Sequence, residues 1–294
     1  MFQNLFILIL VISACATKKQ MTSSINPLPY QLNEPTQTMV MPVALKEISG
    51  LGFSGDGSQL VAIQDEQGII FYLNKKTGNI ERQVTFKDPG DYEDLQTVRD
   101  TTYVLKSKGV LYATSAIQNP TPTVDRYDLG LGKDADLEGL GYDKAHNQLF
   151  IACKGVTENA FERSVYGFSL TTKKRSEKPL FTISLSQIQD FVSTNLKGQS
   201  GFDKYFDATA TEFHFGPSAI AVHPLTGELY MLSSVGKLLL VLSPEGKILN
   251  IEKLDKKIHV QPEGILFEAD GTLYISNEGK KEQDGIIYRF DYKK

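Results

Sequence analysis

Apolar and polar positions alternate in short runs from about residue 38 to the end of the chain, and one pattern recurs five times. Each unit opens with an apolar segment, passes through a polar turn into a β-rich strand, and reaches a third strand after a second turn. The turns contain Gly, Asn and Asp, which accept positive φ or cap the backbone through their side chains. The openings span residues 48–53, 92–98, 137–142, 217–222 and 262–267.

The spacing of these units indicates the architecture. Aligned on the Leu or Ile at the centre of each opening, successive units lie 44, 45, 80 and 45 residues apart. Short strands separated by turns also occur in sandwiches and barrels, but four strands in a repeat of about 45 residues are typical of a propeller blade. The fourth strands, such as residues 80–86, are the most charged, as expected of an outer edge.

The ends of the chain complete the blade count. The last unit has only three strands before Lys294, whereas residues 39–45 form a strand without a unit of its own. We therefore predict an all-β, five-bladed β-propeller of four-stranded blades over residues 38–294, closed by the N-terminal strand. The 80-residue gap leaves six blades as an alternative. Residues 186–215 lack the strand–turn–strand pattern, however, and indicate an insertion that is helical around residues 186–196.

The N-terminus resembles a bacterial lipoprotein signal. Residues 5–13 form an uncharged apolar run, too short to span a bilayer but suited to the core of a signal peptide. An aliphatic and two small residues then precede Cys15, as in a lipobox, although the first four residues carry no Lys or Arg. We predict a signal peptide over residues 1–14 and lipidation of Cys15. A secretory signal with an incidental cysteine, or a buried N-terminal strand, is the alternative.

Residues 15–37 separate this signal from the propeller. They are rich in Ser, Thr, Asn and Pro and show no apolar period, so they bury too little surface to offset their ordering entropy. We expect a flexible tether to a lipid anchor in the bacterial cell envelope. Ala16 lacks the Asp that retains enteric lipoproteins at the inner membrane, which favours the outer membrane.

Composition excludes several other classes. The 294 residues are 41% apolar and 22% charged, which is ordinary for a globular protein. A net charge of −4 argues against a nucleic-acid partner. Two cysteines are too few for a disulfide framework or a cysteine-rich zinc module.

Several sequence blocks resemble the SdiA-regulated family of bacterial exported propellers. They are ISGL, DYEDL, DLEGLGYD, GPSAIAVHPLTGELYMLSS and QPEGILFEADGTLYISNEG. The last two blocks are the most specific, because shorter pieces also occur in gluconolactonase-like, NHL-repeat and phytase propellers. The resemblance runs from about residue 47 to residue 291. It implies a five-bladed fold, a calcium ion in a shared site, and no established catalytic activity.

Equivalent positions at the five openings define a ring. In a propeller the first strand of each blade starts at the mouth of the central channel, so such positions surround the mouth by rotational symmetry. The ring residues are Ser49, Glu93, Glu138, Ser218 and Glu263.

The ring favours a bound cation. Carboxylates that converge on a narrow axis repel one another unless a cation or a proton neutralises them. Oxygen ligands without Cys or His favour Ca²⁺ over zinc. We therefore predict a calcium site formed by Glu93, Glu138 and Glu263, with Asp65 and Asn277 contributed by the ends of second strands.

A structural role is the alternative for these residues. A glutamate at a blade opening can cap a strand end or pair with Lys106 or Lys154, which lie near equivalent positions. Asp94 and Asp136 point to the other face of their strands, where we expect salt bridges.

Two functions are consistent with this sequence. The first is a lipid-anchored, non-enzymatic propeller that binds calcium and holds a protein or a small molecule at the channel mouth. The second is a calcium-dependent hydrolase of a phosphoester or lactone, in which the ion acts as a Lewis acid. The chain contains no G-x-S-x-G, P-loop, H-E-x-x-H or C-x-x-C motif, and no general base stands out beyond the ring. Binding is therefore favoured, although propellers host both classes.

Overall fold

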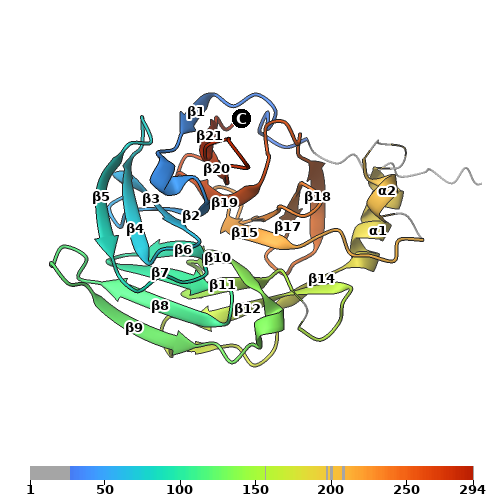
Figure 1. Ribbon diagram of the computed structural model, residues 1–294. Helices are drawn as coiled ribbons and strands as arrows, with labels where there is room; N and C mark the ends of the chain where they lie inside the picture. Colours follow the sequence, from blue (N-terminus) through green and yellow to red (C-terminus); the bar gives the residue numbers. More distant parts are fainter. Residues whose placement is uncertain (1–26, 156, 197, 199–200, 207–208, 294) are drawn as a thin grey trace, which may run out of the picture.

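The computed structural model describes residues 27–155, 157–196, 198, 201–206 and 209–293. The predicted signal peptide, the lipidation residue Cys15 and the first part of the tether lie outside the described residues. The described chain forms five antiparallel sheets set around one axis (Figure 1). The prediction of an all-β, five-bladed propeller is confirmed, and the six-bladed alternative is wrong.

The blades are numbered along the chain, and their strands are given from the axis outward. Blade 1 consists of β2 (Ile48–Phe53), β3 (Gln59–Gln64), β4 (Ile69–Asn74) and β5 (Ile80–Thr85). Blade 2 consists of β6 (Tyr92–Val98), β7 (Thr101–Lys106), β8 (Val110–Ser115) and β9 (Thr123–Asp128). Blade 3 consists of β10 (Leu137–Asp143), β11 (Gln148–Cys153) and β12 (Glu162–Ser169), with an outer edge split between β13 (Lys174–Arg175) and β14 (Phe181–Ser184). Blade 4 consists of β15 (Pro217–Val222), β16 (Leu229–Ser233), β17 (Leu238–Leu242) and β18 (Ile248–Lys253). Blade 5 consists of β19 (Pro262–Phe267), β20 (Leu273–Asn277), β21 (Ile286–Phe290) and β1 (Gln37–Val40).

The N-terminal strand closes the ring, as predicted. β1 pairs antiparallel with β21, and its register sets Val40 opposite Ile286. The strand is shorter than the predicted residues 39–45, because Pro42 caps the 3-10 turn η1 (Val43–Leu45) that leads into β2. Since β1 comes from the start of the propeller and β21 from its end, this one sheet joins both ends of the domain.

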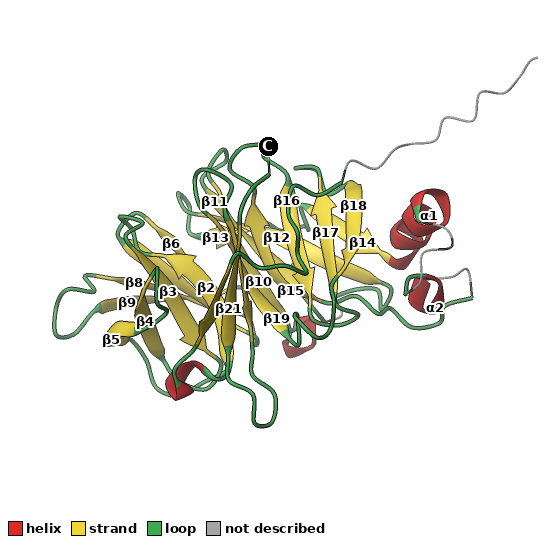
Figure 2. Ribbon diagram, turned by 90° about the horizontal axis from the view of Figure 1, so that it is seen from above, coloured by secondary structure: helices red, strands yellow, loops and turns green. Residues whose placement is uncertain are grey.

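The long gap between blades 3 and 4 forms an insertion outside the ring. α1 (Leu185–Asn195) begins with a capping box formed by Ser184 and Gln187, and α2 (Asp203–Phe206) follows it. The apolar sides of these helices pack with blade 4 in one buried cluster. Figures 1 and 2 show both helices beside the outer strands β14 and β18. Among the described helices, none combines the length and the apolar character needed to cross a bilayer.

The innermost strands approach one another closely because their third residues are small. These residues are Gly50, Gly139, Ala219 and Gly264, and blade 2 alone has an acid there, Asp94. A Cβ on Gly50 would lie only 2.8 Å from the Asp94 Cα atom. The backbones of neighbouring blades are therefore in close contact at the axis.

Residues before β1 contact blades 4 and 5 at the end of the channel opposite the starts of the innermost strands. The Tyr30 hydroxyl donates to the Gly271 carbonyl at 2.6 Å, in the β19–β20 turn. It also lies 2.8 Å from Nε2 of the buried His223, which follows β15. The chain then enters β1 from this end, since Gln37 pairs with Arg289 before Val40 pairs with Ile286.

Candidate functional site

Every innermost strand begins with the same irregularity in its ladder. The register with the second strand shifts by one residue between the first and third positions of each innermost strand. A bulge of this kind releases one residue from the ladder and re-aims its side chain. The released residues are the five ring positions, Ser49, Glu93, Glu138, Ser218 and Glu263.

The two serines of the ring connect neighbouring blades. The Ser49 hydroxyl donates to the Tyr92 carbonyl at 2.9 Å, from blade 1 to blade 2. The Ser218 hydroxyl donates to the Pro262 carbonyl at 2.8 Å, from blade 4 to blade 5. Both side chains are buried, so their hydroxyl protons serve the backbone of the next blade.

One lysine, Lys154, pairs with Glu138 and acts electrostatically on the other two glutamates of the ring. Glu138 and Glu263 are buried, and Glu93 is partly buried. Lys154, the first residue after β11, places its Nζ 2.7 Å from Oε1 of Glu138. The charge of the same ammonium also opposes the rise in the pKa values of Glu93 and Glu263, although it does not reverse that rise.

Burial makes these glutamates hard to ionise together. It raises the pKa of Glu93 to about 10, and the charges of Glu138 and Asp91 add to the rise. It raises the pKa of Glu138 to about 7 although Lys154 opposes the effect, and burial with the charge of Glu138 raises the pKa of Glu263 to about 8. Burial lowers the pKa of Lys154, but Glu138 and Glu263 outweigh it, and the net pKa is raised. The mouth therefore holds protons near neutral pH that a bound cation would displace.

Two predicted ligands at the ends of second strands have buried atoms without partners. Asp65 follows β3, and its Oδ1 has no hydrogen-bond partner among the described residues. Burial and the charges of Glu47 and Glu66 raise its pKa to about 6. Asn277 is 2% exposed, and neither its Oδ1 nor its Nδ2 has a partner in the described part of the chain.

The register shows that Asp65 and Asn277, both predicted as ligands at the ends of second strands, do not occupy equivalent positions. Asn277 pairs with Pro262, just as Gln64 pairs with Ile48, so its position matches Gln64 and not Asp65. The residue of blade 5 that matches Asp65 and Lys154 is Glu278, one step further on. The repeat alone could not give this offset, because the number of residues between paired strands differs from blade to blade.

Asp94 is a buried acid whose role differs from the salt bridge predicted for it. Its Oδ1 accepts the amide proton of Leu95 at 2.8 Å, and its Oδ2 accepts that of Leu140 at 2.7 Å. The amide of Leu51 is a third donor to this carboxylate. Burial raises the pKa of Asp94, and the three amides oppose the rise. Asp94 therefore joins blades 1, 2 and 3 at the axis through their backbones.

Lys106 forms no ion pair with the three ring glutamates. Its Nζ lies 5.0 Å from the centre of the Tyr92 ring, in a cation–π contact. Of the glutamate–lysine pairs considered from the sequence, only the pair of Glu138 with Lys154 forms among the described residues.

The mouth offers oxygen donors, but they do not meet at one point. In the described part of the chain, no three His, Cys, Asp or Glu side chains are grouped closely enough to hold a metal ion. The Lys154 ammonium occupies the cation position next to Glu138. The three ring glutamates thus form an acidic group beside one internal cation, Lys154.

Comparison with known proteins supports the fold and a family. The family model described as SdiA-regulated matches residues 24–281, most of the chain. No match was found among curated proteins.

Solved structures are similar in fold at low identity. Glutaminyl cyclase of Myxococcus xanthus has a TM-score of 0.57 at 11% identity, over 88% of this chain and 95% of that one. The PQQ-bound aldose sugar dehydrogenase of Streptomyces coelicolor has a TM-score of 0.52 at 12% identity, over 88% of this chain and 97% of that one. A chain of a nidogen/laminin complex has a TM-score of 0.50 at 13% identity, over 78% of this chain and 72% of that one. Enzymes and a binding protein thus share this architecture, and the fold alone does not assign an activity.

Proposed function

The chain belongs to the SdiA-regulated family, and from the site at its channel mouth we propose that it is a non-enzymatic binding propeller. Its acidic mouth binds a cation, with calcium as the first candidate. A protein or small-molecule ligand binds over the same mouth. The observation that carries the proposal is the set of three glutamates that share a single ammonium group.

The charge balance of the mouth supports cation binding. When Glu93, Glu138 and Glu263 are all ionised, Lys154 neutralises only one of the three charges. Removing two further charges from water is costly in a buried site. A bound cation removes this cost, so binding and deprotonation of the mouth are linked.

The donor chemistry of the mouth suits calcium. Ca²⁺ prefers carboxylate and amide oxygens and tolerates irregular geometry. Glu93, Glu138 and Glu263 would hold the ion, with the unpartnered oxygens of Asp65 and Asn277 as further donors. Lys154 is paired with Glu138, so calcium has to replace it as the partner of that carboxylate. The donor side chains also have to move closer together, since they are not grouped around one point. The bound ion would neutralise the mouth and offer open positions to an anionic group of a ligand.

Calcium titration tests this proposal. We expect calcium to raise the melting temperature of the purified protein and to bind by isothermal titration calorimetry. The double substitution Glu138→Gln and Glu263→Gln removes two charged donors and is expected to abolish both signals. Lys154→Gln removes the internal competitor and is expected to tighten calcium binding.

A surface double substitution controls for net charge. Glu34→Gln with Glu177→Gln removes two exposed carboxylates far from the ring in sequence, and it is expected to leave the calcium response unchanged. If the ring double mutant keeps the full calcium response, the assignment of the site to Glu138 and Glu263 is wrong.

Hydrolysis is the outcome that would replace the binding proposal. The protein is assayed with calcium on phosphoester and lactone substrates, beside Glu138→Gln. Turnover well above that variant would make the mouth a catalytic centre in which the ion acts as a Lewis acid. We expect equal background rates.

We further propose that Cys15 carries a lipid that attaches the propeller to the cell envelope, at the outer membrane. The lipobox-like sequence before Cys15 supports this attachment. Tyr30 is bound at the end of the channel away from the ring, so the described chain leaves the propeller at the end opposite the acidic mouth. Cys15→Ser is expected to move the protein from the membrane fraction to the soluble fraction. No redistribution would contradict lipidation.

A further inference from the structure

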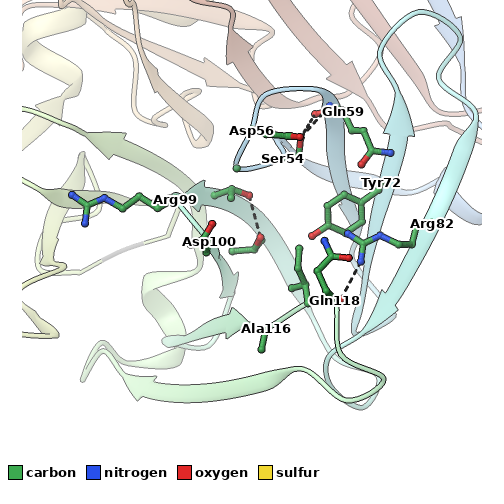
Figure 3. Close-up of a pocket in the computed structure, with 13 residues that line it drawn as sticks. Ser54, Asp56, Gln59, Tyr72, Arg82, Arg99, Asp100, Ala116 and Gln118 are labelled. Carbon is green, nitrogen blue, oxygen red and sulfur yellow. Dashed lines mark hydrogen bonds between the residues drawn. The ribbon is translucent and has the colours of Figure 1, made fainter.

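Two equivalent junctions between blades differ at the end of the propeller opposite the mouth. Between blades 1 and 2, the turns that follow β2 and β6 leave a cavity of about 340 Å³, which Figure 3 shows with Asp56 on the first turn and Arg99 on the second. Between blades 4 and 5, the corresponding turns follow β15 and β19, and the N-terminal segment contacts both of them. We call this segment, residues 27–35, the arm.

Only two arm residues are buried, and a histidine binds each of them. Tyr30 and Leu32 are each 6% exposed and pack in one apolar cluster with blades 4 and 5. Nε2 of His223 lies 2.8 Å from the Tyr30 hydroxyl oxygen. Nε2 of His259, in the connection between β18 and β19, lies 2.9 Å from the Leu32 carbonyl oxygen. Both histidines are completely buried, so two of the four histidines in the chain hold the arm.

The hydrogen bonds assign one proton to each ring, on Nε2. At His223, the Thr226 amide donates to Nδ1 at 3.2 Å, so Nδ1 carries no proton. The Tyr30 hydroxyl gives its own proton to a backbone carbonyl of the β19–β20 turn, so it accepts from Nε2 of His223. At His259, Nε2 donates to the Leu32 carbonyl, which can only accept. Each neutral histidine therefore gives its single ring proton to the arm.

A second proton finds no acceptor at either ring. It would bind Nδ1, which at His223 faces the Thr226 amide, itself a donor. Nδ1 of His259 is buried and has no hydrogen-bond partner among the described residues. A charged ring that cannot complete its hydrogen bonds is costly in a buried position. Both histidines therefore favour the neutral form as long as the arm covers them.

Acid acts on the two ends of the propeller in opposite directions. Burial lowers the pKa of both histidines below 6.5 and outweighs the carboxylate that faces each ring, which is Glu228 at His223 and Asp255 at His259. At the mouth, burial raises the pKa values of the ring glutamates, so acid protonates them and relieves their repulsion. The pairing of β1 with β21 involves neither histidine, so the sheet that closes the ring can stay paired after the arm has left.

We propose that the arm is a proton-controlled latch: protonation of His223 and His259 releases residues 27–35 while the five blades stay closed. Release exposes both rings to water, where an imidazolium is hydrated. It adds about 30 Å of free chain before β1. It also uncovers the aromatic side chains of blades 4 and 5 and of the C-terminus that surround the Tyr30 ring, which are Tyr230, Phe267 and Tyr292.

Hydrogen exchange measured by mass spectrometry at pH 7.5 and pH 5.0 tests the latch. Two amides report on the arm, that of Glu34 bonded to the Gln31 carbonyl and that of Lys293 bonded to the Pro29 carbonyl. A histidine that is neutral when covered and has its ordinary pKa when released favours release by up to about thirtyfold over this range. After correction for intrinsic exchange, we expect protection of both amides to fall at least about tenfold. We expect the amides of β17 to keep their protection.

A tryptophan in the arm gives a second readout. The chain contains no tryptophan, and Leu28 lines a cavity of about 730 Å³ beside blade 4 that has room for a larger ring. In Leu28→Trp we expect the fluorescence emission to shift to longer wavelength as the pH falls from 7.5 to 5.0. The far-UV circular dichroism spectrum is expected to stay the same, because the blades remain folded. An unchanged emission maximum would contradict release of the arm.

Glutamine variants separate the latch from general effects of acid. Glutamine keeps an N–H donor near the position of Nε2 but does not titrate. The double substitution His223→Gln and His259→Gln is expected to remove the pH dependence of exchange in the arm, and His259→Gln alone is expected to retain part of it. The ratio of exchange at the two pH values is compared, so a variant with a weaker arm at both values still decides the question. His146→Gln is the control, since His146 is an exposed histidine of blade 3 bonded to Asp143, and it is expected to behave as the parent does.

Three results would overturn the proposal. The first is equal protection of the arm at the two pH values in the parent protein. The second is the full pH dependence of the parent in the double glutamine variant. The third is loss of protection in β17 together with the arm at pH 5.0, which would mean that acid unfolds the propeller as a whole.

Discussion

Glu93 and Asp94 are neighbours in the chain and both are acids near the propeller axis, but their surroundings differ completely. Asp94 accepts backbone amides from Leu51, Leu95 and Leu140, which belong to three blades. Among the described residues, no backbone amide donates to Glu93, which shares a hydrogen bond with Asp91, and burial with neighbouring carboxylates raises its pKa to about 10. The fold supplies Asp94 with backbone donors, whereas at Glu93 burial and the nearby carboxylates outweigh the attraction of Lys154.

This difference separates a structural acid from a binding acid. A buried carboxylate with several N–H donors stabilises the fold and leaves little for a ligand. A buried carboxylate without donors destabilises the fold until a proton or a cation arrives, which is the property of a site that selects cations. The bulge causes the difference, because it turns Glu93 out of the ladder while Asp94 stays between the strands.

Removal of the Asp94 carboxylate is expected to have the largest effect. Asp94→Ala leaves three buried amides without an acceptor, and each unmet donor costs about 1–3 kcal/mol. We expect the free energy of unfolding to fall by at least about 3 kcal/mol. Urea denaturation monitored by circular dichroism measures this loss.

The neighbouring acid is the matched control. Glu93→Ala removes a carboxylate to which no backbone amide of the described residues donates, so it is expected to leave stability unchanged or higher in calcium-free buffer. Similar losses in the two variants would mean that Glu93 also supports the fold, and the comparison would fail.

The repeat in the sequence was enough to predict the architecture. The equal spacing of the openings and the missing strand of the last unit gave five blades and the closure by β1. The insertion was recognised by its lack of a strand pattern, and α1 lies where a helix was expected. These features follow from local periodicity, which a single chain displays directly.

Roles at the axis could not be predicted in the same way. Sequence symmetry places Ser49 and Glu93 at equivalent positions, but only the contacts between blades show that the serine bonds to the next blade. The three amides on Asp94 come from residues up to 46 positions away, and no local pattern signals them.

The pH dependence of stability sharpens the comparison with an intermediate effect. Burial raises the folded-state pKa of Glu138 to about 7 and of Glu263 to about 8, from 4.5. The folded state therefore favours their protonated forms, and this contribution is fully present below about pH 4.5 and is lost as pH rises through 7 and 8. Burial lowers the pKa of His223 and His259 from 6.5, so they cost stability only below that pH.

Between pH 6.5 and 8 the buried glutamates dominate the trend, because burial raises the folded-state pKa values of Glu93, Glu138 and Glu263. The contribution of each falls by about 1.4 kcal/mol per pH unit between its unfolded-state and its folded-state pKa, and it stops falling once the folded protein has lost that proton. In calcium-free buffer we expect the free energy of unfolding to fall by at least about 2 kcal/mol over this range. Saturating calcium is expected to flatten the curve, and the double substitution Glu138→Gln and Glu263→Gln is expected to reduce its slope, since Glu93 remains in that variant. A flat curve in the parent protein without calcium would show that these carboxyl groups are not strained.

The serines give the smallest effect and the finest test of the comparison. Ser218→Ala removes one hydrogen bond to the Pro262 carbonyl, and a typical bond of this kind contributes about 1 kcal/mol. We expect a loss of this size in urea denaturation and the same calcium-induced rise in melting temperature as in the parent. If the substitution instead removes the calcium response, Ser218 belongs to the cation site. The ring would then act as five equivalent positions, and the division between acids that serve the fold and acids that serve a ligand would have to be redrawn.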